Sequence, residues 1–177
     1  MTVVLGTVLE GPCKMPFYTD LQSVFRALGG REKEFDWLVT DLDCDQFPVE
    51  FQAMNSAWVL PGHTLEDVVM RQSPPIQFNW GTFSGVRGGT KIDLAHLADL
   101  PYADGNPGFW TGTPAIQYRG AEIEIVCWNA QATLLLTTDA DLSRRFRAYF
   151  PEARDLEERN RAGTGPPSRA ATKASNA

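Results

Sequence analysis

The sequence predicts an α+β protein: a mostly antiparallel sheet with three to four helices packed on one face. Three observations lead to this fold class. Segments in which apolar and polar residues alternate with a period of two outnumber segments with helical spacing. Several neighbouring segments are joined by turns short enough for hairpins. The clearest unit, residues 121–150, reads as two strands followed by a closing helix, and the rest of the chain is expected to pack against it.

The first part of the chain gives a strand, a helix and a second strand. Residues 2–9 are rich in Val and Leu, which favour strands. Residues 17–28 place apolar side chains at helical spacing, and Gly29 and Gly30 end this helix because glycine accepts the left-handed conformation of a C-cap. Residues 35–42 alternate with a period of two and predict the second strand.

The middle of the chain carries shorter signals. Thr64 begins a helix that ends at Arg71, and Thr90 begins another short helix. Loops are expected at the glycine-rich residues 85–89 and at residues 101–114. The strands expected here cover residues 57–60, 76–83 and 115–118.

The closing unit is a hairpin followed by an amphipathic helix. Residues 122–128 alternate, Asn129 suits a tight turn, and residues 132–137 return as the second strand. Thr138, with Asp141 three residues later, has the form of a capping box for the helix that follows. Such a unit packs a core and does not by itself require chemistry.

Length and composition predict one domain over residues 1–157 and a disordered tail over residues 158–177, which lacks large apolar side chains. No apolar run reaches the roughly 20 residues that span a bilayer, and the N-terminus lacks the features of a signal peptide. We therefore expect a cytoplasmic protein without a membrane partner.

Charge and metal-ligand content exclude several kinds of function. The formal net charge is −6, which disfavours nucleic acid as a partner and favours a basic protein. The three cysteines, Cys13, Cys44 and Cys127, form no CxxC pair and are expected to be reduced and mostly buried. His63 and His96 lack a second ligand at metal spacing, so we expect no metal site and no cofactor.

An acidic run at the end of the second strand is the first candidate site. Asp41, Asp43 and Asp45 follow an apolar strand, and the Asp41/Asp43 pair resembles the DxD motif of haloacid-dehalogenase-type phosphatases. That resemblance implies a Mg²⁺-dependent phosphatase with Asp41 as the nucleophile. The alternative is an acidic turn that faces water, and we expect no catalytic residue here.

The loop at residues 101–114 is the second candidate, because aromatic side chains on a loop either pack back onto the protein or bind a partner. Asp104 and Asn106 lie among these aromatics, and such residue types are favoured at interfaces. With the acidic run, the predicted partner-binding residues are Tyr102, Asp104, Asn106, Phe109, Trp110, Asp41, Asp43 and Asp45.

Three segments, FDWLVTDLDC, FNWGTFSG and AEIEIVCWNAQATLLLTTDADLSRRFRAYFPEARDLE, resemble small uncharacterised bacterial α+β proteins, including immunity proteins of polymorphic toxin systems. Asn129 stands where that pattern often has an acidic residue. The matching motifs are structural. The resemblance implies a non-enzymatic, partner-binding role and identifies no functional residue.

Three functions follow from these observations. The first is a cytoplasmic, non-enzymatic interaction protein, in the form of an immunity protein that neutralises a basic toxin through an acidic surface. The second is a small-ligand binding or sensor domain with an aromatic pocket lined by Trp37, Trp58 and Trp80. The third is the phosphatase that uses Asp41 and Asp43. The sequence leaves the oligomeric state open.

Overall fold

The computed structural model describes residues 3–11, 17–52, 56–97, 99–163 and 165–167, and within them the chain builds one seven-stranded sheet. The strand order is β3-β2-β4-β5-β6-β1-β7, and every neighbouring pair is antiparallel. The strands are β1 Leu5–Glu10, β2 Phe35–Cys44, β3 Ala57–Pro61, β4 Phe78–Arg87, β5 Ile123–Trp128, β6 Ala132–Thr137 and β7 Arg154–Asp155. The α-helices are α1 Leu21–Leu28, α2 Gly62–Met70, α3 Ala140–Tyr149 and α4 Leu156–Arg161. Short 3-10 helices are η1 Arg31–Glu34, η2 Val49–Phe51, η3 Leu94–His96 and η4 Pro107–Trp110. This arrangement confirms the predicted α+β class.

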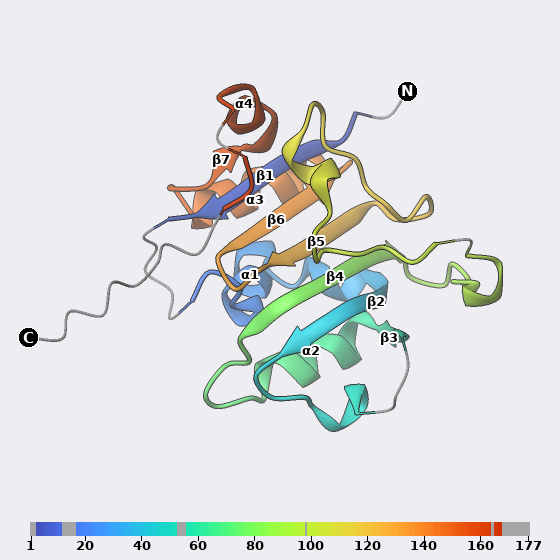
Figure 1. Ribbon diagram of the computed structural model, residues 1–177. Helices are drawn as coiled ribbons and strands as arrows, with labels where there is room; N and C mark the ends of the chain where they lie inside the picture. The colour runs from blue at the N-terminus through green and yellow to red at the C-terminus, as the bar shows by residue number, and fades with distance from the viewer. Residues whose placement is uncertain (1–2, 12–16, 53–55, 98, 164, 168–177) are drawn as a thin grey trace, which may run out of the picture.

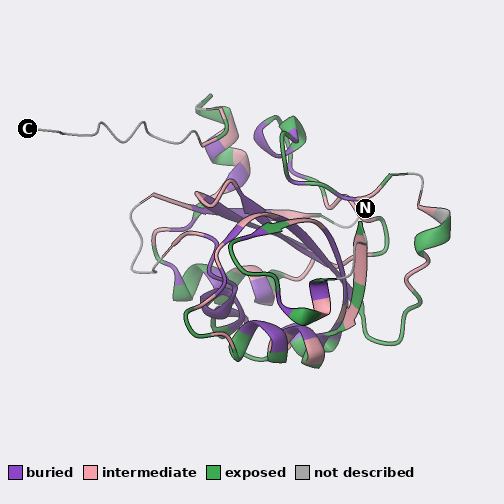
Figure 2. Ribbon diagram, turned by 60° about the horizontal axis from the view of Figure 1, so that its bottom comes forward, coloured by how far each residue is buried: buried purple, intermediate pink, exposed green. Residues whose placement is uncertain are grey.

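The sheet is buried on both faces near its centre, as the purple strands in Figure 2 show. Helices α1, α2 and α3 cover one face and enclose the larger hydrophobic core. The other face is covered by residues 101–118, drawn in yellow in Figure 1 and called the covering segment below, together with α4. The alternation of β6 fits this arrangement, because Leu135 joins the first core and Leu134 and Leu136 join the second.

The closing unit forms as predicted, with one change at its cap. Asn129 and Ala130 have positive φ values of 48° and 53°, so the turn between β5 and β6 uses the left-handed conformation. The N-cap of α3 is Asp139 and not Thr138: its carboxylate accepts the backbone N–H groups of Asp141 and Leu142.

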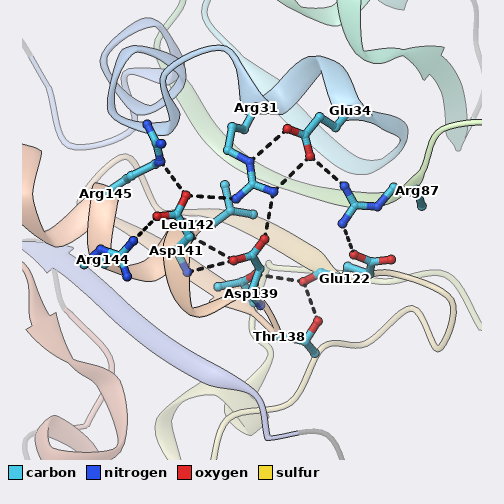
Figure 3. A network of polar contacts seen from close by, with 11 residues as sticks. Arg31, Glu34, Arg87, Glu122, Thr138, Asp139, Asp141, Leu142, Arg144 and Arg145 are labelled. Atoms are coloured by element: carbon cyan, nitrogen blue, oxygen red, sulfur yellow. Dashed lines mark hydrogen bonds and ion pairs between the residues drawn. The ribbon is translucent and has the colours of Figure 1, made fainter.

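An ion-pair network ties η1 to the start of α3 and to the central strands (Figure 3). Arg31 contacts Glu34, Asp139 and Asp141 at 3.0, 2.9 and 3.2 Å. Arg87 of β4 pairs both with Glu34 and with Glu122, the residue just before β5. Networks of this kind fix element ends more effectively than isolated surface pairs do.

Several expected elements differ in the structure. The helix expected from Thr90 is instead the short 3-10 helix η3, whose N-cap is Asp93. Residues 115–118 form no strand, because their backbone bonds to a buried side chain described below instead of to a ladder. The expected glycine-rich loop at residues 85–89 begins inside β4, which continues to Arg87 by pairing with β2. The predicted tail at residues 158–177 starts with α4, because Leu156 is fully buried and Asp155 caps the helix. Residues 168–177 lie outside the described residues.

Within the part of the chain that the structure describes, no helix combines the length and apolar composition that a membrane span requires.

Candidate functional site

A cavity of about 570 Å³ opens where β2, β3 and β4 meet the covering segment. Its charged lining residues are all carboxylates, and three of its walls are aromatic. We call it the acidic cavity. Its lining residues are Asp41, Leu42, Asp43, Ser56, Trp58, Trp80, Leu100, Pro101, Tyr102 and Asp104. The site therefore joins the two stretches that the sequence analysis treated separately.

Asp41 holds the covering segment at the mouth of the cavity. Its carboxylate accepts the backbone N–H groups of Ala103 and Asp104, both at 2.7 Å. Its backbone has a φ of 51°, a left-handed conformation that Asp tolerates better than most residues, and the β2–β4 register is interrupted at this point. The neighbouring Thr40 adds a third link, since its hydroxyl donates to the carbonyl of Pro101 at 2.7 Å.

The other two cavity carboxylates are exposed. Asp43 accepts one hydrogen bond from the side-chain amide of Asn79 at 3.1 Å. Asp104 turns towards water next to Tyr102, whose side chain is 46% exposed. Asp45 lies outside the cavity, where its carboxylate accepts the backbone N–H of Gln77 at 2.9 Å. Two of the three carboxylates are thus available to a ligand.

The remaining predicted residues of the loop are structural. Phe109 and Trp110 are 2% and 6% exposed and pack edge-on against Trp128, so in this structure they belong to the core and present no surface to a partner. Asn106 is also buried, and it caps η4 by accepting the N–H of Gly108 at 2.9 Å. These aromatic side chains belong to the second core, because burial of their apolar area holds the covering segment on the sheet.

The predicted aromatic pocket forms only in part. Trp58 and Trp80 line the acidic cavity together with Tyr102. Trp37 does not, because its side chain is fully buried in the core under the helices and donates to the carbonyl of Glu32 at 2.9 Å. The cavity thus combines features of two hypotheses from the sequence, the acidic interaction surface and the aromatic ligand pocket.

Glu124 is a buried carboxylate that sequence reasoning placed on a polar strand face. It is 0% exposed beneath the covering segment, accepts the Ser84 hydroxyl at 2.9 Å, and accepts the N–H of Gln117 at 3.2 Å. The side chain of Gln117 in turn links Tyr102 and Asn106. Burial raises the pKa of Glu124 and outweighs these hydrogen bonds, which act in the opposite direction. Val126 and Trp128 lie on the same strand face as Glu124 and are apolar, and this was the sign in the sequence that the face is covered.

Glu124→Gln is expected to remove a pH dependence of stability. The pKa of Glu124 in the folded state lies above the ordinary 4.5, so the protonated side chain favours folding. The stability that this side chain contributes is therefore fully present below pH 4.5 and is lost as the pH rises through the folded-state pKa. The unfolding free energy of wild type minus that of the variant should therefore fall with rising pH, by up to about 1.4 kcal/mol per pH unit. Urea denaturation from pH 4 to pH 8 measures this difference. A constant difference, or one that grows with pH, contradicts it.

The structure gives no support to a metal-dependent phosphatase. The sheet is antiparallel, whereas phosphatases of the haloacid-dehalogenase type have a parallel sheet with alternating strands and helices, and the Asp41 carboxylate is already bonded to two N–H groups. Among the described residues, no three His, Cys, Asp or Glu side chains converge as metal ligands. His63 is exposed at the start of α2.

Two of the cysteines are buried free thiols. Burial, helped by the charge of Asp45, raises the pKa of Cys44 to about 12. Burial also raises the pKa of Cys127. Both thiols are poor nucleophiles as a result. Cys13 lies outside the described residues.

Comparison with known proteins found no matching family model, curated protein or solved structure.

Proposed function

We propose that this chain is a non-enzymatic, cytoplasmic interaction protein that docks a basic protein partner in the acidic cavity, as expected of an immunity protein that neutralises a toxin. The observation that carries the proposal is the lining of the cavity: among the described residues its charges are the carboxylates of Asp41, Asp43 and Asp104, and Trp58 and Trp80 lie among them. A cation is attracted both to carboxylates and to aromatic faces.

The support of the cavity favours docking over chemistry. Asp41 and Glu124 hold the covering segment at two places through backbone N–H groups, so Tyr102 and Asp104 are presented in a fixed position. A preorganised surface loses little conformational entropy when it binds. Opposite charge on the partner accelerates encounter and rejects acidic proteins.

The proposal is tested by capture from the lysate of the source organism, with the full chain as bait. The wild type should retain one basic protein at equal stoichiometry, and Asp43→Asn/Asp104→Asn should weaken this capture by at least about tenfold, since both exposed cavity charges are lost.

The matched control, Glu152→Gln/Glu157→Gln, removes one carboxylate just before β7 and one in the first turn of α4, at the β7 edge of the sheet and far from β3 in the strand order. It should capture as the wild type does. Equal capture by both double variants would show that the acidic cavity is not the docking site.

A small-ligand binding or sensor domain is the second candidate, because a cavity of about 570 Å³ with two tryptophans lies in the size range of metabolite sites. It predicts that a cationic metabolite raises the melting temperature of the wild type but not of Trp80→Ala. If a protein partner is captured at equal stoichiometry and no metabolite raises the melting temperature, the result favours docking of a protein.

A further inference from the structure

A second cavity, of about 410 Å³, adjoins the acidic cavity and shares two of its walls, Asp43 and Trp80. Its other side chains are mainly amides and carry no positive charge. We call it the amide cavity. The amides are Gln77, Asn79, Asn129 and Gln131. The two cavities therefore meet at Asp43 and Trp80, with carboxylates on one side and amides on the other.

The amide cavity is rigidly built. Asn129 and Ala130 take left-handed conformations in the β5–β6 turn, and the N–H of Ala130 donates to the carbonyl of Asn79 at 2.9 Å. Asn79 also donates to Asp43, at 3.1 Å. This turn is consequently fixed against the start of β4, so its backbone keeps its position relative to the acidic cavity.

Most of these amides have hydrogen-bonding capacity to spare. The side chains of Gln77, Asn129 and Gln131 bond to no other residue in the described ranges. A side-chain amide offers a carbonyl acceptor and two N–H donors, so it can bond both to the N–H and to the carbonyl of a peptide. A row of free amides is therefore suited to an extended backbone, which cannot satisfy its own polar groups.

We propose that the partner binds through an extended peptide segment, whose arginine or lysine side chain enters the acidic cavity while its backbone bonds to the amides beyond Trp80. This inference rests on the proposed function and adds the form of the partner. A few residues suffice, since an extended chain advances about 3.3 Å per residue. The carboxylates in the described lining of the two cavities, which includes no positively charged residue, favour a cation over a neutral sugar.

The test compares three probes on the full chain by calorimetry: a blocked tetrapeptide with one arginine among alanines, the same peptide with N-methylated backbone amides after the arginine, and agmatine acetylated on its amine (agmatine below), which carries the guanidinium as its one charge without the flanking peptide backbone. The first should bind about tenfold more tightly than the other two, because two net hydrogen bonds are worth about this factor. Gln77→Ala/Gln131→Ala should abolish the difference and leave agmatine binding unchanged.

The control is Gln46→Ala, an exposed amide outside both cavities, which should bind all three probes as the wild type does. Equal binding of the tetrapeptide and agmatine overturns backbone recognition and leaves the proposed function intact if capture still depends on Asp43 and Asp104. Binding of a neutral oligosaccharide, with no binding of the peptide, overturns it in favour of a glycan. Failure of all three probes also overturns it, and capture with the charge variants then decides separately on the proposed function.

Discussion

Asp41→Ala is expected to lower the free energy of unfolding by about 3 kcal/mol and to abolish partner binding. The variant leaves the N–H groups of Ala103 and Asp104 without the carboxylate that accepts both at 2.7 Å, and each charge-assisted bond contributes about 1.5 kcal/mol or more. Alanine also fits poorly at a φ of 51°. Urea denaturation measures the loss, and hydrogen exchange should show faster exchange at the Ala103 and Asp104 amides.

Two further variants separate support of the fold from contact with the partner. Asp41→Asn keeps an acceptor oxygen and tolerates the left-handed backbone, so it should recover most of the lost stability. Asp43→Asn changes an exposed carboxylate with one hydrogen bond and should alter stability by less than about 0.5 kcal/mol while weakening binding. If Asp41→Ala unfolds like the wild type, Asp41 does not hold the covering segment.

The strands and the closing unit were predictable because their evidence is local. A period of two in residues 122–128 and 132–137 determines which side chains share a face, and β5 and β6 follow that pattern. The same local reasoning placed Gly29 correctly at the C-cap of α1, where its φ is 68°.

The candidate site was predictable only in its residue types. Asp41, Asp43, Tyr102 and Asp104 were singled out as acidic or aromatic positions, but their convergence depends on bonds between residues about 60 apart in sequence. No pattern in the sequence marks the left-handed backbone at Asp41. Alternation along β5 predicted that Glu124 faces solvent, but β5 is buried on both faces. The covering segment that buries the second face has no periodic pattern in the sequence and so could not be predicted.

Phe109 and Trp110 show why an aromatic loop is ambiguous. A loop that crosses a sheet face must bury its backbone polar groups or find partners for them, and this one finds Asp41, Thr40 and Glu124. Its aromatic side chains then complete the core underneath. Of the loop residues that were predicted to bind a partner, only Tyr102 and Asp104 are exposed, which is why the candidate site is smaller than the predicted one.

Trp128→Ala is expected to have the largest effect on stability, a loss of about 4 kcal/mol. The indole is 5% exposed, and its ring centroid lies 5.0 Å from that of Trp80 and 4.9 Å from that of Trp110. Truncation therefore opens a cavity between the sheet and the covering segment and removes the support behind Trp80, a wall of both cavities. Urea denaturation followed by circular dichroism measures the loss without depending on tryptophan fluorescence.

A double-mutant cycle separates attachment of the covering segment from the general cost of a cavity. Trp110→Ala, Trp128→Ala and the double variant should show a coupling energy of about 1 kcal/mol, as edge-to-face aromatic pairs do. Trp128→Phe keeps a ring at the centre of the cluster and should retain about half of the lost stability, together with agmatine binding. A coupling energy near zero would mean that the covering segment is held by Asp41 and Glu124 and not by its aromatic residues, and the acidic cavity would then survive loss of the Trp110 side chain.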